Sequence, residues 1–518
     1  MEGGDADAAN EKFGTIHMPI SCAPGVQAPF ERGVALLHSF WYEEATKQFA
    51  AIAETDPHCA MAQWGLAMAE WRPFWDGMPD ARRQAGAAEI DQATALQPKT
   101  DRERRYIAAL SAYLHADAAQ SDQALEAYNA AMGALSQAYP DDVEAQAFHG
   151  LGLAAATIGV ADPVPPARKA LAVLEPGFRA HPDHPGFAHY IIHTCDTPEL
   201  AREALPAAEH YAAIAPSSAH ALHMPGHIFA RLGMWPQDIA SNKASVKASE
   251  FAETHHLGGV GHQMHADEFL LYAYLQQGND QEAKRVHDRI EPLVAHLKAL
   301  PGIADDDMFG FSTYFQVELP DIYDLERADW QAVLAVPEPA APLVSTKYYR
   351  VWAQAIAAGH LRNAAAADAA AASAKSLYDA TAAEGSPISL EIQAAQATIE
   401  AWQHFAHHED AAALTKIGEA ADIQDRVGQA EVDIPAREMY GDMLLIDQRP
   451  AEALQQYRTA LKLSPNRFNG LYHAGLAAEA AGQPAEARAF YRQLLTVTDG
   501  GRHTQRPEIA HVREFTAR

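Results

Sequence analysis

Small, aromatic and apolar residues recur at helical spacing in residues 29–57, which read PFERGVALLHSFWYEEATKQFAAIAETDP. Gly33 and Ala45 are small enough to let two antiparallel helices approach closely, and Phe49 is placed to fill the space between them. Pro57 then ends the second helix, because proline lacks the backbone N–H that a helix interior needs. This segment therefore predicts a helical hairpin.

The same arrangement returns near the C-terminus. Gly441 with Tyr457, and then Gly475 with Tyr491, repeat it at a spacing of about 34 residues. A period of this length is typical of stacked helix–turn–helix units. Helices are also expected over 101–115, 121–138, 142–158 and 165–181, and no stretch alternates apolar and polar residues as a strand does. The pattern predicts an all-α fold, an α-solenoid of helical hairpins.

These repeats resemble tetratricopeptide repeats, most strongly over residues 29–98 and 435–495. The chain is also similar to bacterial tetratricopeptide proteins that carry phrases like ALLHSFWY, CAMAxWGxAM and HALHMPxHIFxRLGxW, present here as ALLHSFWY, CAMAQWGLAM and HALHMPGHIFARLGMW. The resemblance implies stacked pairs of helices with a concave groove. It supplies no activity.

Changes in composition along the chain divide the expected solenoid into segments. Gly, Pro and acidic residues gather in 300–322, which predicts a loop there. We expect an N-terminal extension over 1–28, N-terminal repeats over 29–182, histidine-rich central repeats over 183–299, a long loop or connection over 300–345, degenerate helical repeats over 346–430, a C-terminal repeat pair over 431–498 and a C-terminal tail over 499–518.

Acidic residues dominate the charge of the chain. Its 68 Asp and Glu outnumber 39 Lys and Arg and give a formal net charge of −29. This excess opposes phosphate backbones and anionic lipid headgroups, so we expect no nucleic-acid partner, while it favours cationic ligands such as metal ions. No apolar run reaches the roughly 20 residues that a membrane span needs, so no membrane insertion is expected.

The first ten residues, MEGGDADAAN, are polar and acidic and lack the pattern of a secretory signal. As the sequence stands this predicts a cytoplasmic protein. The alternative is a periplasmic or secreted protein from which a signal peptide has been removed. Cys22 and Cys59 flank the first hairpin and are either a disulfide of an oxidising compartment or two buried free thiols.

Histidines provide the sharpest functional signal. Ten of the 26 fall within residues 189–276, which concentrates them far beyond an even distribution. Residues three, four and seven apart share one face of a helix, so His220, His223 and His227 form a stripe and His189 and His193 form a pair. Helical His-x3-His pairs are a common way of presenting two imidazoles to a transition metal.

The repeat register implied by the tetratricopeptide resemblance places the stripe in the concave groove and not in the packed core. The next unit places His265 on the same groove. The preceding unit turns His193 towards it and leaves His189 nearer the packing face. We therefore expect His193, His223 or His227, and His265 to converge on one ion of zinc, copper or iron.

Metal-bound imidazoles need neighbours that orient them or bind a ligand beside them. The candidates by sequence or groove position are Tyr190, Asp196, Arg231, Asn242, Asp267, Glu268 and Tyr272. Pro225 removes a helical hydrogen bond and is expected to kink the helix between His223 and His227, or to mark a late helix start.

Each of these features also has a structural interpretation. A single helical histidine is usually a satisfied core or surface residue, and the candidate neighbours are equally suited to helix caps or ion pairs. The aromatic residues Trp71, Phe74 and Trp75 either pack a hairpin or form the edge of a pocket. No phosphate-binding loop, HExxH, CxxC or GxSxG motif is present.

Two functions of different classes follow. The first is a solenoid whose histidine-lined groove binds a transition metal, with metal-dependent hydrolase or oxidoreductase chemistry on a small-molecule ligand. The second is a tetratricopeptide adaptor whose groove binds a partner protein or peptide. Such grooves generally present Lys, Arg and Asn to carboxylates, whereas this one presents imidazoles, which favours the first function.

Overall fold

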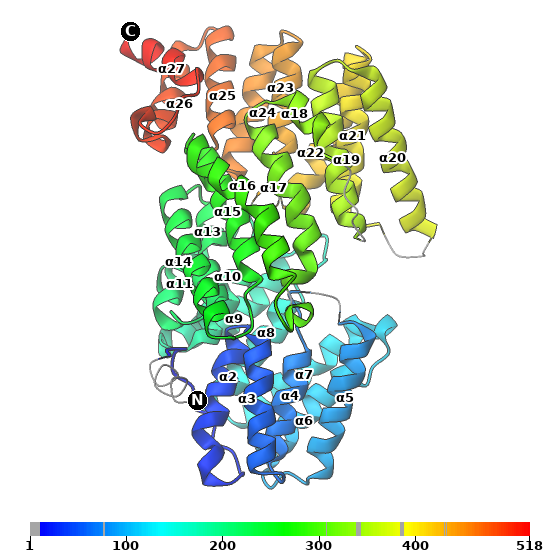
Figure 1. Ribbon diagram of the computed structural model, residues 1–518, viewed down its shortest axis with the longest axis vertical. Helices are drawn as coiled ribbons and strands as arrows, with labels where there is room; N and C mark the ends of the chain where they lie inside the picture. The colour runs from blue at the N-terminus through cyan, green and yellow to red at the C-terminus, as the bar shows by residue number, and fades with distance from the viewer. Residues whose placement is uncertain are drawn as a thin grey trace.

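The computed structural model describes residues 11–75, 78–306, 308–337, 343–383, 388–428, 430 and 432–518. Within these ranges every regular element is helical, and consecutive helices pack against one another as hairpins. The hairpins stack along the long axis of the molecule from the N-terminal helices at one end to the C-terminal helices at the other (Figure 1). The all-α solenoid expected from the sequence is therefore confirmed.

The N-terminal part comprises α2 (Gln27–His38), α3 (Tyr42–Thr55), α4 (Ala60–Glu70), α5 (Asp80–Ala95), α6 (Asp101–Leu114), α7 (Ser121–Ala138), α8 (Val143–Ala155) and α9 (Val164–Ala180). The four helices expected over 101–181 correspond to α6–α9. The central part comprises α10 (Pro185–Thr194), α11 (Ala201–Ile214), α12 (Ala219–His223), α13 (Pro225–Arg231), α14 (Trp235–Thr254), α15 (His262–Gln276) and α16 (Asp280–Leu297).

The C-terminal part comprises α17 (Ser312–Glu326), α18 (Trp330–Ala335), α19 (Val344–His360), α20 (Ala364–Ala383), α21 (Leu390–Ala406), α22 (Asp410–Val427), α23 (Ala436–Ile446), α24 (Pro450–Leu463), α25 (Phe468–Ala480), α26 (Pro484–Val497) and α27 (Glu508–Ala517). In Figure 1 the central helices α10–α16 lie between these two ends.

The recurring glycines allow one helix to receive an aromatic ring from its neighbour. A Cβ atom on Gly65 would lie 2.4 Å from the ring of Phe49, and one on Gly475 would lie 2.1 Å from the ring of Tyr491. Both distances are far inside van der Waals contact. Because Phe49 and Tyr491 are fully buried, these pairs fix the spacing between α3 and α4 and between α25 and α26.

Two boundaries predicted from the sequence are wrong. The long loop expected over 300–345 contains α17 and α18, and α17 runs through Pro320. The prolines and acids of this stretch concealed an apolar face, formed by Leu319, Ile322 and their neighbours, that is buried against the array. The tail expected over 499–518 likewise ends in α27, whose Ile509 is buried.

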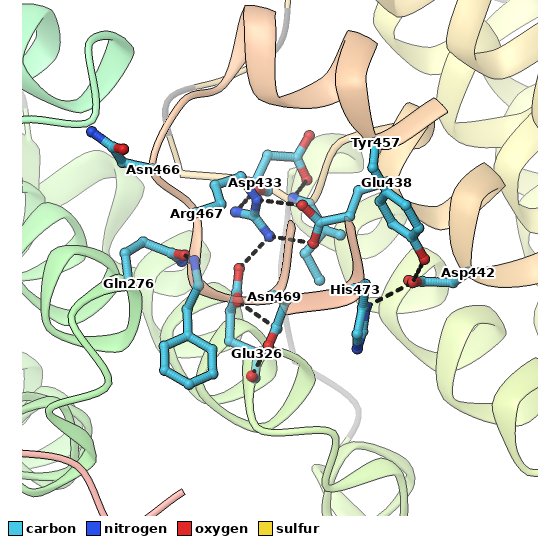
Figure 2. A network of polar contacts seen from close by, with 12 residues as sticks. Gln276, Glu326, Asp433, Glu438, Asp442, Tyr457, Asn466, Arg467, Asn469 and His473 are labelled. Atoms are coloured by element: carbon cyan, nitrogen blue, oxygen red, sulfur yellow. Dashed lines mark hydrogen bonds and ion pairs between the residues drawn. The ribbon is translucent and has the colours of Figure 1, made fainter. Parts of the chain in front are cut away.

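A buried arginine joins the C-terminal repeats to the central helices. Arg467, just before α25, donates to Glu326 of α17 at 2.7 Å and to Glu438 of α23 at 2.9 Å (Figure 2). A buried guanidinium is stable only when such partners satisfy it. The backbone N–H of Phe468 also donates to Gln276 Oε1 of α15 at 3.0 Å. These contacts hold the C-terminal part on the helix that carries His265.

No helix in the described residues is both long enough and apolar enough to cross a membrane. Of the two alternatives for Cys22 and Cys59, the structure contains the disulfide, with Cα atoms 4.9 Å apart. It links the segment before α2 to the start of α4, and Cys195 is left as a buried free thiol.

The disulfide predicts a defined thiol count. Protein unfolded without reductant should titrate one thiol with Ellman's reagent, that of Cys195, and three thiols after reduction. The bridge joins residues 37 apart in sequence, and closing a loop of that order stabilises a protein by about 3–4 kcal/mol. Reduction should therefore also lower the melting temperature. Three reactive thiols before reduction would contradict the pairing.

Candidate metal centre

The six histidines predicted as ligands come together in the interior as two groups. His189 and His193 of α10 lie with His220 of α12, and we call this group triad A. Triad B consists of His223 of α12, His227 of α13 and His265 of α15. Within each triad, one ring nitrogen from every histidine lies within 4.8 Å of the other two.

The proline in the histidine stripe divides it into two helices. α12 ends at His223 and α13 begins at Pro225, whose missing N–H belongs to the first turn of a new helix. The break expected at Pro225 is thus present. His223 and His227 converge across it, with their Nε2 atoms 2.9 Å apart.

Triad B has the dimensions of a three-histidine metal site. Its ring centroids are separated by 4.8 Å for His223 and His227, 4.3 Å for His223 and His265, and 5.6 Å for His227 and His265. Three imidazoles bound through nitrogen at about 2.0–2.1 Å to a tetrahedral ion have centroids about 5 Å apart. The rings are therefore placed as ligands of one ion would be.

Every Nδ1 atom of triad B faces an oxygen acceptor. His223 Nδ1 lies 2.6 Å from Asn242 Oδ1, and His227 Nδ1 lies 2.9 Å from an Asp196 carboxylate oxygen. His265 Nδ1 lies 2.6 Å from Glu268 Oε2. Each Nδ1 therefore donates its hydrogen outward, which leaves Nε2 with a lone pair. Ligating histidines characteristically have such outer partners.

Asn242 is itself held so that its oxygen faces His223. Its Nδ2 donates to Asp238 Oδ1 at 2.6 Å and to the Asp238 carbonyl at 3.1 Å. Gly226 makes this approach possible, because a Cβ there would lie 2.7 Å from Asn242 Nδ2. The glycine of the repeat thus contributes to setting the tautomer of His223.

Triad A has similar dimensions but a different environment. Its ring centroids are 4.8 Å apart for His189 and His193, 4.9 Å for His189 and His220, and 5.9 Å for His193 and His220. His189 Nδ1 donates to the carbonyl oxygen of His38 at 2.6 Å, and its Nε2 lies 3.0 Å from His220 Nε2.

Aromatic rings from the N-terminal part enclose triad A. Phe74 stacks on His193 with centroids 4.1 Å apart, Trp75 meets His220 edge-on at 4.9 Å, and Phe40 lies 4.2 Å from His189. Phe74 and Trp75 therefore contact the histidines, whereas Trp71 packs against Tyr113 and Tyr128 of its own part of the array.

The expectation that the stripe lines an open groove is wrong. His223 is 0% exposed and His220 is 2% exposed, because α10, α15 and the aromatic rings cover the face that the repeat register left open. Burial disfavours the charged imidazole and lowers the pKa of His189 to about 3. Burial likewise lowers the pKa values of His193, His220 and His223 well below the ordinary range.

Triad B retains one partly open side. The side chains of His227 and His265 keep 13% and 20% of their exposure, and Asp196 keeps 18%. Arg231 donates from Nε to the second oxygen of Asp196 at 2.9 Å, so this carboxylate is held by both a histidine and an arginine.

Three of the candidate neighbours lie elsewhere. The hydroxyl of Tyr190 lies 2.6 Å from His38 Nδ1, Asp267 forms an ion pair with Arg289, and Tyr272 donates to the Asp433 carbonyl at 2.8 Å. Asp196, Arg231, Asn242 and Glu268 lie around triad B as the sequence predicted. Asp267 occupies another face of α15, whereas Tyr272 shares the face of His265 but lies about two helical turns further along, where it contacts Asp433.

Sequence reasoning missed a third buried group. Glu144 of α8 accepts from His38 at 2.7 Å and from His184 at 3.1 Å. Burial raises the pKa of Glu144, but the two histidines outweigh it and hold the pKa below the ordinary value. His38 and Glu144 are 106 residues apart, so no local spacing signalled their meeting. His262, whose ring lies 5.1 Å from that of His220, was also missed.

A cavity of about 730 Å³ is separate from both triads. It lies among α16, α17, α19, α23 and the residues before α27. His473 and Asp442 line it, with His473 Nδ1 2.8 Å from an Asp442 oxygen that also accepts from Tyr457 at 2.6 Å (Figure 2). This cavity offers a second place for a small molecule.

Comparison with known proteins assigns no function. No protein-family model matches the chain, and no curated protein is significantly similar to it.

Proposed function

We propose that triad B binds one transition-metal ion through His223, His227 and His265, and that the protein acts through this ion on a small ligand. One observation carries the proposal. His223 and His227 both donate from Nδ1, so their Nε2 lone pairs face each other across 2.9 Å. Two facing lone pairs repel unless a cation lies between them, and His265 supplies a third lone pair beside them.

The chemistry of the three ligands limits which metal ions could bind. Three neutral imidazoles suit zinc, copper or iron and are poor ligands for magnesium or calcium, which prefer oxygen. Three protein ligands leave a fourth position for water, the arrangement found in catalytic rather than structural zinc sites. The partial exposure of the His227 and His265 side chains supports a fourth position on the side open to a ligand.

The metal would determine the reaction class. Zinc lowers the pKa of a bound water and favours hydrolysis, whereas copper or iron favours oxidoreductase chemistry. The adaptor alternative is less well supported, because His220 and His223, two of the histidines expected to line a peptide groove, are buried beneath other helices. A peptide would have to displace those helices to reach these two residues.

We also propose a protein family and a cellular compartment for this chain. The glycine–aromatic packing of successive hairpins supports assignment to the tetratricopeptide proteins. The Cys22–Cys59 disulfide supports an oxidising compartment, periplasmic or extracellular, over the cytoplasm, because disulfides persist where thiols are not kept reduced. The net charge of −29 argues against a nucleic-acid partner.

The proposal predicts bound metal that depends on triad B. We compare the wild type with the double variant His223→Ala/His227→Ala, either as purified or as apoprotein reloaded with zinc, copper or iron. Elemental analysis should find one equivalent of metal less in the double variant. Far-UV circular dichroism should stay helical. His210→Ala is the matched control, because that histidine is exposed and bonds only within its own helix. Unchanged metal content in the folded double variant would refute the site.

The residues that accept hydrogen bonds from the Nδ1 atoms of triad B should affect metal affinity without abolishing binding. Asp196→Asn keeps an oxygen facing His227 but removes the charge that strengthens the imidazole as a ligand. Substituting outer partners typically weakens metal binding about 10–100-fold. We expect the zinc dissociation constant, measured with a competing chelator, to rise about 10-fold or more. Glu203→Gln, which alters a surface pair with Arg168, should leave it unchanged. Equal affinity in the Asp196 variant would exclude an orienting role.

A further inference from the structure

We propose that triad A binds a second transition-metal ion, so that the six histidines form a binuclear, all-imidazole centre. The inference uses His189, His193 and His220 and none of the ligands of triad B. It therefore extends the proposed function, but it stands or falls on its own observations.

The first observation is that no choice of tautomer satisfies triad A. His189 donates from Nδ1 to the His38 carbonyl, so its Nε2 must be a lone pair. If His220 donates from Nε2 to that lone pair, its own Nδ1 is a buried acceptor without a donor. If His220 carries its hydrogen on Nδ1, that hydrogen has no acceptor among the described residues, and two lone pairs meet at 3.0 Å.

His193 presents the same problem independently. Its Nε2 is shielded from solvent and has no hydrogen-bond partner among the described residues. Leaving a buried polar atom unpaired is destabilising, so such atoms are rare and call for an explanation. An ion bound by Nε2 of His189, His193 and His220 gives the His193 Nε2 lone pair a partner and separates the two lone pairs that would otherwise meet between His189 and His220.

If His220 binds the ion through Nε2, its Nδ1 carries the hydrogen. A cavity beside the ring has room for a hydrogen-bond partner of that N–H. His220 lines a small cavity of about 10 Å³, together with Ser218 and His262. A cavity of roughly that size holds one water molecule, which can donate or accept a hydrogen bond and so serves His220 Nδ1 in either tautomer. The second ion is therefore needed for the unpaired Nε2 of His193 and not for His220 alone.

The second observation is geometric. The centroid separations of triad A, 4.8, 4.9 and 5.9 Å, match the spacing of about 5 Å expected for three imidazoles on one tetrahedral ion. Phe40, Phe74 and Trp75 pack directly on the three rings and fix their orientation. The rings are thus held in place by packing before any ion arrives.

The buried group of His38, Glu144 and His184 shows that burial alone does not leave a histidine without hydrogen-bond partners. His184 Nδ1 accepts from the Gly186 N–H and its Nε2 donates to Glu144. His38 Nε2 donates to the same carboxylate, and its Nδ1 accepts from the Tyr190 hydroxyl. Every ring nitrogen there has a complementary partner, so that group needs no metal. Triad A lacks such complementarity.

The two triads adjoin each other and would form one centre. His220 and His223 stand on the same short helix with ring centroids 6.3 Å apart, and His193 and His227 are 6.4 Å apart. The predicted ligands are imidazoles without thiolate or carboxylate. Of the divalent ions that suit such a set, copper and zinc bind most tightly.

Metal stoichiometry of the full chain tests the inference. Apoprotein prepared with a chelator is titrated with cobalt(II), followed by its visible absorption, and zinc-loaded protein is measured by elemental analysis. Two variants remove triad A ligands, His193→Gln and His220→Gln, so that the result does not depend on one of them folding. His223→Ala with His227→Ala removes triad B, and His210→Ala is the control. Circular dichroism checks the fold of each.

We expect two equivalents in the wild type and the control, one in each triad A variant and one in the triad B variant. One equivalent in the wild type, lost only from the triad B variant, would overturn the second site and leave the proposed function intact. One equivalent lost only from the triad A variants would refute the proposed function instead. A single equivalent lost from both would mean one shared ion and would also overturn the second site.

Discussion

A neutral imidazole has one N–H and one lone pair, and this constraint governs the centre of the protein. In triad B every N–H is already committed: His223 to Asn242, His227 to Asp196 and His265 to Glu268. The three remaining lone pairs are then directed by their own hydrogen bonds into a shared space. Three lone pairs directed into one space repel one another, and a cation between them relieves that repulsion. The proposed metal ion would have this role.

The solenoid builds this arrangement from ordinary repeat features. The break at Pro225 lets His223 and His227 converge from two short helices, and Gly226 lets Asn242 reach His223. α10 and α15 bring the remaining histidines from either side. Arg467, buried between Glu326 and Glu438, holds the C-terminal repeats against α15. Stacked hairpins thus place, on neighbouring helices, residues that lie far apart in sequence.

Much of this was predictable from the sequence. The glycine–aromatic period predicted the helical hairpins, and helical spacing grouped His223 with His227. The repeat register implied by the tetratricopeptide resemblance placed His265 beside them. Asp196, Asn242 and Glu268 were also identified as neighbours. The burial of the stripe was not predictable, because repeat register describes one hairpin and its neighbours and not the aromatic rings that reach in from residues 40, 74 and 75. For the same reason the contacts of Glu144 with His38 and His184 were not predicted. The apolar face that makes 312–326 a helix was not predicted either.

The division of the histidines into two triads was also beyond the sequence. His193 was expected to share an ion with His223 or His227 and His265, but it lies with His189 and His220. Spacing along a helix fixes which residues share a face. It does not fix which of two adjacent partners each ring meets, since that depends on rotation about the side-chain bonds and on helix offsets of a few ångströms.

The most direct test of the account is the location of the ion itself. Crystals of zinc-loaded protein, measured on both sides of the zinc absorption edge, should give an anomalous peak inside triad B at about 2.0–2.1 Å from the Nε2 atoms of His223, His227 and His265. Zinc-loaded crystals with no anomalous density between His223 and His227 would contradict the central claim.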